Sequence, residues 1–147
     1  MDMRSILGLP VVIYKLVQIL KVKKPNAVFT WMYHADLIGG IAAYISGIRN
    51  IIWGVRNTQI PQSTTSSTGL IIKLCAFLSY YVPRIIVCNA HMGRYEHVKL
   101  GYCYKKLIVI PNGYDLKLFQ PTRDLKKAVR KNLGITETAK IVGIVGR

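Results

Sequence analysis

Acidic residues are scarce in this sequence. Its 147 residues include 6 Asp and Glu against 21 Lys and Arg, which gives a formal net charge of +15. Such a balance favours anionic partners, namely phosphates, acidic lipid headgroups or nucleic acid, and by itself does not choose among them. Low-complexity stretches are also missing, and hydrophobic residues make up 51% of the chain, which argues against disorder and for a real core.

Long apolar runs are absent as well. Nowhere do about 18 uncharged apolar residues follow one another, so we expect no membrane-spanning helix. Residues 69–82, GLIIKLCAFLSYYV, are too few and include Lys73, which indicates a helix that is buried or lies against a membrane. The N-terminal ILGLPVVIY imitates a signal sequence, but Lys15 interrupts it and no small-residue cleavage site follows. We therefore expect a cytoplasmic protein.

Cysteines are few and follow no metal-binding pattern. Cys75, Cys88 and Cys103 show no CxxC or Cys/His spacing, so no metal site is predicted. They lie in or beside apolar segments, which is typical of reduced, buried thiols in a cytosolic protein.

The sequence does contain a regular alternation of apolar segments. Strands are predicted at 27–32, 50–55, 84–89, 107–111 and 140–146, and helices at 10–21, 36–46, 69–82, 90–100 and 122–133. Asp36 is expected to cap the second helix, and Gly47, Gly101 and Gly134 are expected to follow helix ends. Strands that are apolar throughout favour an α/β fold, a Rossmann-like parallel sheet with helices on both faces.

Five segments carry a resemblance to a known family: KPNAVFTWMYHADLIGG, IIWGVRNTQIP, FLSYYVPRIIVCNAH, HVKLGYCYKKLIVIPNGYDLKLFQP and IVGIVGR. In this order they resemble the nucleotide-sugar glycosyltransferases of family four, which have the GT-B fold of two facing Rossmann-like domains. Because the chain opens with a helix and stops after a strand, we interpret it as a fragment. Residues 1–121 would be part of the N-terminal, acceptor-side domain, and residues 122–147 the hinge helix and first strand of a truncated donor-side domain.

The resemblance also implies an activity. The expected reaction transfers a sugar from a nucleotide sugar to an acceptor hydroxyl or a lipid-linked glycan in surface polysaccharide synthesis, with no metal or other cofactor. The leaving diphosphate gains negative charge, and fixed cations lower that barrier. By resemblance Arg147 is the donor-diphosphate arginine; the alternative is an ordinary C-terminal Arg.

Two catalytic candidates follow predicted strands. His34 stands between the strand 27–32 and Asp36, where its ring can hold an acceptor hydroxyl or a donor phosphate; the alternative is a structural histidine. Arg56 closes the strand 50–55 and suits an anionic acceptor such as a lipid-linked phosphate; the alternative is a solvated Arg. Gly39 and Gly40 would let the helix approach a neighbouring backbone or ligand closely.

The candidate substrate-binding residues lie at the same kind of position, and they are Asn57, Asn89, His91, Asn112 and Gly113. Asn89 and His91 open the helix 90–100, whose free N–H groups favour an anion; a plain helix cap with an exposed His fits equally. Asn112 and Gly113 are predicted to form a turn with positive φ, before a cap by Asp115. His97, in the middle of the helix 90–100, is predicted at the surface.

Two other classes of protein remain open. A nucleic-acid-binding module would explain the charge, but the basic residues do not form one stripe with interleaved aromatics, so no nucleic acid partner is expected. An inactive, interaction-only α/β fragment would explain the cut ends. The basic clusters KVKK, YKK and LKKAVRK also predict that the protein sits peripherally on anionic lipid, at the inner face of the cytoplasmic membrane.

Overall fold

The computed structural model describes residues 8–57, 67–120 and 122–143. The chain divides into two compact units, one ending at Asn112 and one beginning at Gly113. The assignment of residues 122–147 to a donor-side domain stays a prediction.

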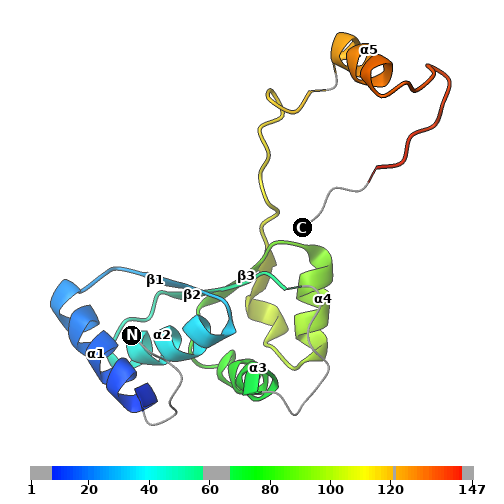
Figure 1. The fold of residues 1–147 in the computed structure, drawn as a ribbon. Coiled ribbons are helices and arrows are strands. Elements are labelled where there is room, and N and C mark those ends of the chain that lie inside the picture. Colours follow the sequence, from blue (N-terminus) through cyan, green and yellow to red (C-terminus); the bar gives the residue numbers. More distant parts are fainter. Residues whose placement is uncertain (1–7, 58–66, 121, 144–147) are drawn as a thin grey trace. The chain divides into compact units, whose positions relative to one another are not determined.

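The first unit is built around a four-stranded parallel sheet with the strand order β1-β2-β3-β4 (Figure 1). The strands are β1 (Val28–Trp31), β2 (Ile51–Val55), β3 (Ile85–Cys88) and β4 (Leu107–Val109). The helices are α1 (Leu9–Lys23), α2 (Tyr33–Ile45), α3 (Ser67–Leu78) and α4 (His91–Lys99), and the short 3-10 helix η2 (Tyr104–Lys106) precedes β4. This confirms the predicted α/β class and four of the five predicted strands.

Connections between neighbouring strands place the helices. Each strand pairs with the next one along the chain, so right-handed crossovers in one direction bring α2, α3 and α4 to the same face of the sheet. Figure 1 shows α1 beside α2 on that side. The opposite face carries Phe29, Trp31 and Ile108, each 40–50% exposed. The sequence predicted helices on both faces, and the helices described in the first unit, α1 to α4, lie on one of them.

The core lies between the sheet and the crossover helices. Its buried residues include Tyr33, Leu37, Ile51, Trp53, Val55, Ile72, Cys75, Ala76, Ile86, Cys88, Tyr102 and Leu107. All three cysteines are buried free thiols, as predicted.

Two glycines allow α2 to pack closely on the sheet. A Cβ at Gly40 would lie 2.6 Å from Nε1 of Trp53, and one at Gly39 would lie 2.7 Å from Cγ2 of Thr30. The helix therefore does approach the sheet closely, but the contacts are with side chains of Thr30 and Trp53 and not, as the sequence had suggested, with a backbone or a ligand.

The second unit holds one helix among its described residues, α5 (Arg123–Asn132), which Gly134 follows with φ +64°. Gly47 and Gly101 also have positive φ beyond the ends of α2 and α4, as predicted. The strand predicted at 140–146 is not seen in residues 140–143, and residues 144–147 lie outside the described part. A strand needs a paired neighbour, and the described part of this unit contains none.

Candidate functional site

The predicted site residues of the first unit gather at one edge of the sheet. Parallel pairing sets the ends of β1, β2 and β3 side by side, because Trp31 is level with Gly54 and Val55 is level with Cys88. The residues that follow these strand ends are His34, Arg56, Asn57, Asn89 and His91, with Asn112 after β4. The carboxyl edge of an open parallel sheet is where ligands are bound in such folds. The role of each residue stays a prediction.

Arg56 is held against an aromatic ring at this edge. Its guanidinium carbon lies 4.3 Å from the centroid of the Trp31 ring, in a cation–π contact. Trp31 leans over β2 because Gly54 has no side chain, and a Cβ there would lie 2.8 Å from Nε1 of the indole. Phe29 flanks the same indole, with ring centroids 4.6 Å apart. Arg56 itself is exposed, so the guanidinium is supported by the ring and remains open to an anion.

His34 lies in the first turn of α2 and is exposed to solvent. The helix begins earlier than predicted, at Tyr33, because Met32 has φ +74° and turns the chain directly out of β1. His34 is therefore a helical residue at the carboxyl edge. Its side chain is not buried in the core, and its role in a site stays a prediction.

Asp36 is not the helix cap that the sequence predicted. The cap position belongs to Met32, and Asp36 is completely buried inside α2. The Thr30 hydroxyl donates a hydrogen bond of 2.6 Å to Oδ1 of Asp36, and the Gly54 backbone also hydrogen-bonds the carboxylate. Oδ2 has no hydrogen-bond partner in the structure. Burial dominates these hydrogen bonds and raises the pKa of Asp36 to about 7.

The structure thus adds Asp36 to the groups near the candidate site. Its hydrogen bonds link α2 to Thr30 of β1 and to the Gly54 backbone of β2. The apolar Leu37 and Ile38 that follow it were the only sequence signal for its burial, and such a signal is weak next to the usual preference of Asp for caps.

At the end of β3 the predicted helix cap is also absent. The cap residue of α4 is Ala90, with extended backbone and no side-chain hydrogen bond, so Asn89 does not cap the helix. The side-chain oxygen of Asn89 is buried without a hydrogen-bond partner, and His91 is exposed in the first turn. Asn89 is therefore not the cap of α4, His91 is exposed as the cap alternative expected, and the binding role of both residues stays a prediction.

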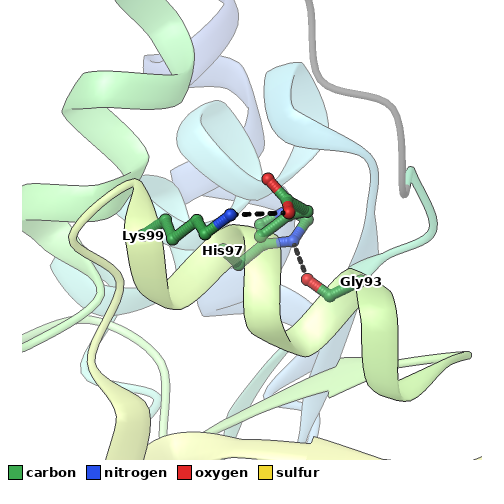
Figure 2. A network of polar contacts seen from close by, with 4 residues as sticks. Gly93, His97 and Lys99 are labelled. Atoms are coloured by element: carbon green, nitrogen blue, oxygen red, sulfur yellow. Dashed lines mark hydrogen bonds and ion pairs between the residues drawn. The ribbon is translucent and has the colours of Figure 1, made fainter.

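His97 is buried, and the prediction of a surface position is wrong. Its Nδ1 donates to the carbonyl of Gly93 at 2.6 Å, since a carbonyl can only accept (Figure 2). Nε2, 3.0 Å from the Tyr33 hydroxyl, then accepts from that hydroxyl. Burial lowers the pKa of His97, which keeps the ring neutral. On the exposed side of the helix Lys99 pairs with Glu96 at 3.2 Å (Figure 2).

The remaining predicted residues lie at the end of the first unit or beyond it. Asn112 and Gly113 are exposed in an irregular segment, and neither has positive φ, so the predicted Asn-Gly turn is wrong. Asp115 does cap the following turn, because its Oδ1 accepts from the backbone N–H of Lys117 at 2.9 Å. Arg147 lies outside the described residues.

Comparison with known proteins identifies one whole-chain relative. The chain is 27% identical over 147 residues to a UDP-Gal:alpha-D-GlcNAc-diphosphoundecaprenol alpha-1,3-galactosyltransferase of Escherichia coli, covering 99% of this chain and 36% of the relative. No family model matches the chain. The chain therefore spans about a third of the length of this relative.

Solved structures share the fold. HepE of Anabaena in complex with UDP has a TM-score of 0.68 at 17% identity, over 83% of this chain and 32% of that chain. A UDP-N-acetylglucosamine 2-epimerase from Rickettsia bellii has a TM-score of 0.60 at 17% identity, over 92% of this chain and 35% of that chain. These similarities confirm the Rossmann-like fold and do not select a reaction, because one fold serves many chemistries.

Proposed function

We propose that the chain is the acceptor-side part of a glycosyltransferase that moves a sugar from a nucleotide sugar to a lipid-linked acceptor. The observation that carries the proposal is the similarity to a galactosyltransferase across 99% of the chain. That relative is named for a UDP-sugar donor and for a diphosphate-linked acceptor. A family-four membership, a fragment of a GT-B enzyme and a role in surface polysaccharide synthesis are parts of the same proposal.

The chemistry assigns a task to each group at the carboxyl edge. The acceptor hydroxyl oxygen bonds to the sugar carbon while the bond from that carbon to the diphosphate breaks, and the hydroxyl proton leaves to a base. His34 is exposed where it can hold or accept that proton. Arg56 faces the anionic part of the acceptor, and Asn57, Asn89, His91, Asn112 and Gly113 contact the sugars. Arg147 belongs to the donor diphosphate, and protein cations take the place of a metal there.

Charge supports an acceptor at a membrane surface. Among the described residues of the first unit, twelve are Lys or Arg and only two are carboxylates, namely Asp36, which is buried, and Glu96, which is partly exposed. No helix of the described residues is long and apolar enough to cross a bilayer. We propose that the protein meets its acceptor on the cytoplasmic surface of the membrane, with anionic lipid as its partner and without nucleic acid.

Replacing Arg56 with Ala is expected to lower kcat/KM for a diphosphate-linked acceptor by about 10- to 100-fold, the value of a hydrogen bond to a charged group. The KM for the nucleotide sugar should change little, because the donor diphosphate is assigned to another arginine. Initial rates of the full-length protein with each substrate varied in turn would measure both effects.

Arg49 provides a matched control for this variant. Its guanidinium lies 4.3 Å from the Tyr44 ring centroid, in the same type of contact, but it precedes β2 at the opposite edge of the sheet. Arg49→Ala should leave the acceptor kinetics unchanged. Equal losses of kcat/KM in the two variants would show that Arg56 acts only through the net positive charge of the protein. The assignment of Arg56 to the acceptor would then be wrong.

Replacing His34 with Gln is expected to lower kcat about tenfold, because one hydrogen bond to the reacting hydroxyl is weakened. The amide keeps a hydrogen-bond donor and an acceptor, so the variant removes the imidazole without removing all hydrogen bonding. Unchanged kcat with saturating substrates would remove His34 from the site.

A further inference from the structure

The outward side of α3 is apolar although it faces solvent. Its inward residues Ile72, Cys75 and Ala76 belong to the core. On the other side an exposed stripe runs along the helix and its following turn, and its members are Leu70, Lys73, Leu74, Phe77, Tyr80 and Tyr81. Leu70 is 60% exposed and Phe77 is 65% exposed. We call this set the α3 stripe.

From Gly69 onward this helix is apolar around its whole circumference apart from Lys73. Helices of this kind normally lie inside a core or in contact with lipid, since water contact with both sides is unfavourable. Two aromatic rings of the α3 stripe also pack against each other, since the centroids of the Phe77 and Tyr81 rings lie 5.7 Å apart. Tyrosine has an apolar ring and a polar hydroxyl, so such a pair is suited to the boundary between lipid and water.

Two lysines lie in or contact the α3 stripe, and no carboxylate is part of it. Lys73 lies within it, and Lys106 anchors its end, with Nζ donating to the Tyr80 carbonyl at 2.6 Å. Lys105 lies over the neighbouring Tyr104 ring. In the described part of the first unit, the only carboxylate that is not fully buried is Glu96 on α4. The surroundings therefore fit an anionic partner with an apolar interior.

We propose that the α3 stripe is the surface by which the protein docks on an anionic lipid bilayer. Phe77, Leu70 and Leu74 would enter the boundary between headgroups and acyl chains, while the lysines would pair with lipid phosphates. A second copy of the chain would bring equal positive charge to the surface. Nucleic acid would supply the charge but no apolar phase for the leucines. This inference rests on the proposed membrane location and adds the surface that makes the contact.

The test compares vesicle binding of the wild-type protein with that of the double variant Leu70→Gln/Phe77→Gln. Both side chains are exposed, so the variant should keep the wild-type circular dichroism spectrum and melting temperature. Vesicles are made of phosphatidylcholine alone or of phosphatidylcholine and phosphatidylglycerol in equal parts. The wild-type protein should sediment with the mixed vesicles and be released as salt rises, because exposed charges are screened over about 10 Å at 0.1 M. The double variant should bind at least about tenfold more weakly, since two large apolar side chains lose their burial.

Ile45→Gln on α2 is the matched control. Ile45 is 57% exposed at the C-terminal end of α2, outside the α3 stripe and outside the basic clusters, so it offers an exposed apolar side chain on another helix. It should bind the mixed vesicles like the wild-type protein. A loss as large as that of the double variant, or wild-type binding by the double variant, would overturn the assignment to the α3 stripe.

Further outcomes separate the other partners and the proposed reaction. A change of oligomeric state in the double variant without vesicles would assign the stripe to a second copy, and weaker binding to a DNA or RNA duplex would assign it to nucleic acid; either overturns the proposal. Transfer to a water-soluble acceptor with a short tail should be equal in the two proteins. If the wild-type protein transfers sugar but does not bind vesicles, the docking proposal is wrong and the proposed function stands. If it binds vesicles but does not transfer sugar, the proposed function is wrong and the docking proposal stands.

Discussion

The Asp36→Asn variant is expected to gain stability relative to the wild-type protein as the pH rises from 5 to 8, by about 2–3 kcal/mol. Folding raises the pKa of Asp36 from the ordinary 3.8 to about 7. The folded protein thus holds a proton that the unfolded chain has already released. The contribution of protonated Asp36 to the free energy of unfolding is fully present below pH 3.8 and is lost as the pH rises to 7. Asn at this position can accept the same hydrogen bonds and does not titrate.

Urea unfolding of both proteins at pH 5, 7 and 8 would measure this difference. His97 acts with the opposite sign, because its lowered pKa costs stability as the pH falls below about 6.5. It is present in both proteins and cancels from the difference. A pH-independent difference for Asp36→Asn would mean that the carboxylate is solvated and that the burial described above is wrong.

Replacing Trp53 with Ala is expected to lower the free energy of unfolding by about 3–5 kcal/mol, the usual cost of removing a large aromatic from a core. Trp53 is completely buried in β2, one of the two central strands, and touches α2 where Gly40 lacks a side chain. The cavity would open between the sheet and the helix that carries His34 and Asp36. Denaturation midpoints with the wild-type protein as reference would give the value.

Trp31, the other of the two tryptophans, is the control for this substitution, because it lies on the opposite face of the sheet. It is 44% exposed, so Trp31→Ala should cost about 1 kcal/mol or less. The same substitution is expected to weaken acceptor use, since Arg56 loses the ring beneath it. Equal destabilisation by the two variants would show that the exposed face of the sheet is covered in solution.

The fold was largely predictable because its signals are local. The strands are apolar runs, and the glycines after α2, α4 and α5 mark helix ends in the sequence itself. What the sequence could not show depends on distant partners. Tyr33, which accounts for the burial of His97, is 64 residues away in the chain. Likewise, the burial of Asp36 depends on β2, which follows it by about a helix length.

The sequence was sufficient to predict that the candidate site lies at the carboxyl ends of the strands. Polar residues after apolar strands indicated His34, Arg56, Asn57, Asn89 and His91, and parallel pairing does set these positions along one side of the sheet. The support of Arg56 by Trp31 was not predictable, because it depends on the pairing register that places Trp31 beside Gly54. Asn112 and Gly113 were assigned a turn from their dipeptide alone, and the backbone there is irregular, without positive φ at either residue.

The strand order also determines how the sheet can assemble during synthesis. Val28 pairs with Ile51, Ile52 with Ile85 and Ile86 with Leu107, so each pairing joins a strand to the one made just before it. Among the described strands the partner is always the next strand to leave the ribosome, so each connection to be closed is one crossover long. Once β3 has emerged, Trp53 can have a strand on either side. The order of translation therefore permits these strands to assemble in sequence, one crossover at a time.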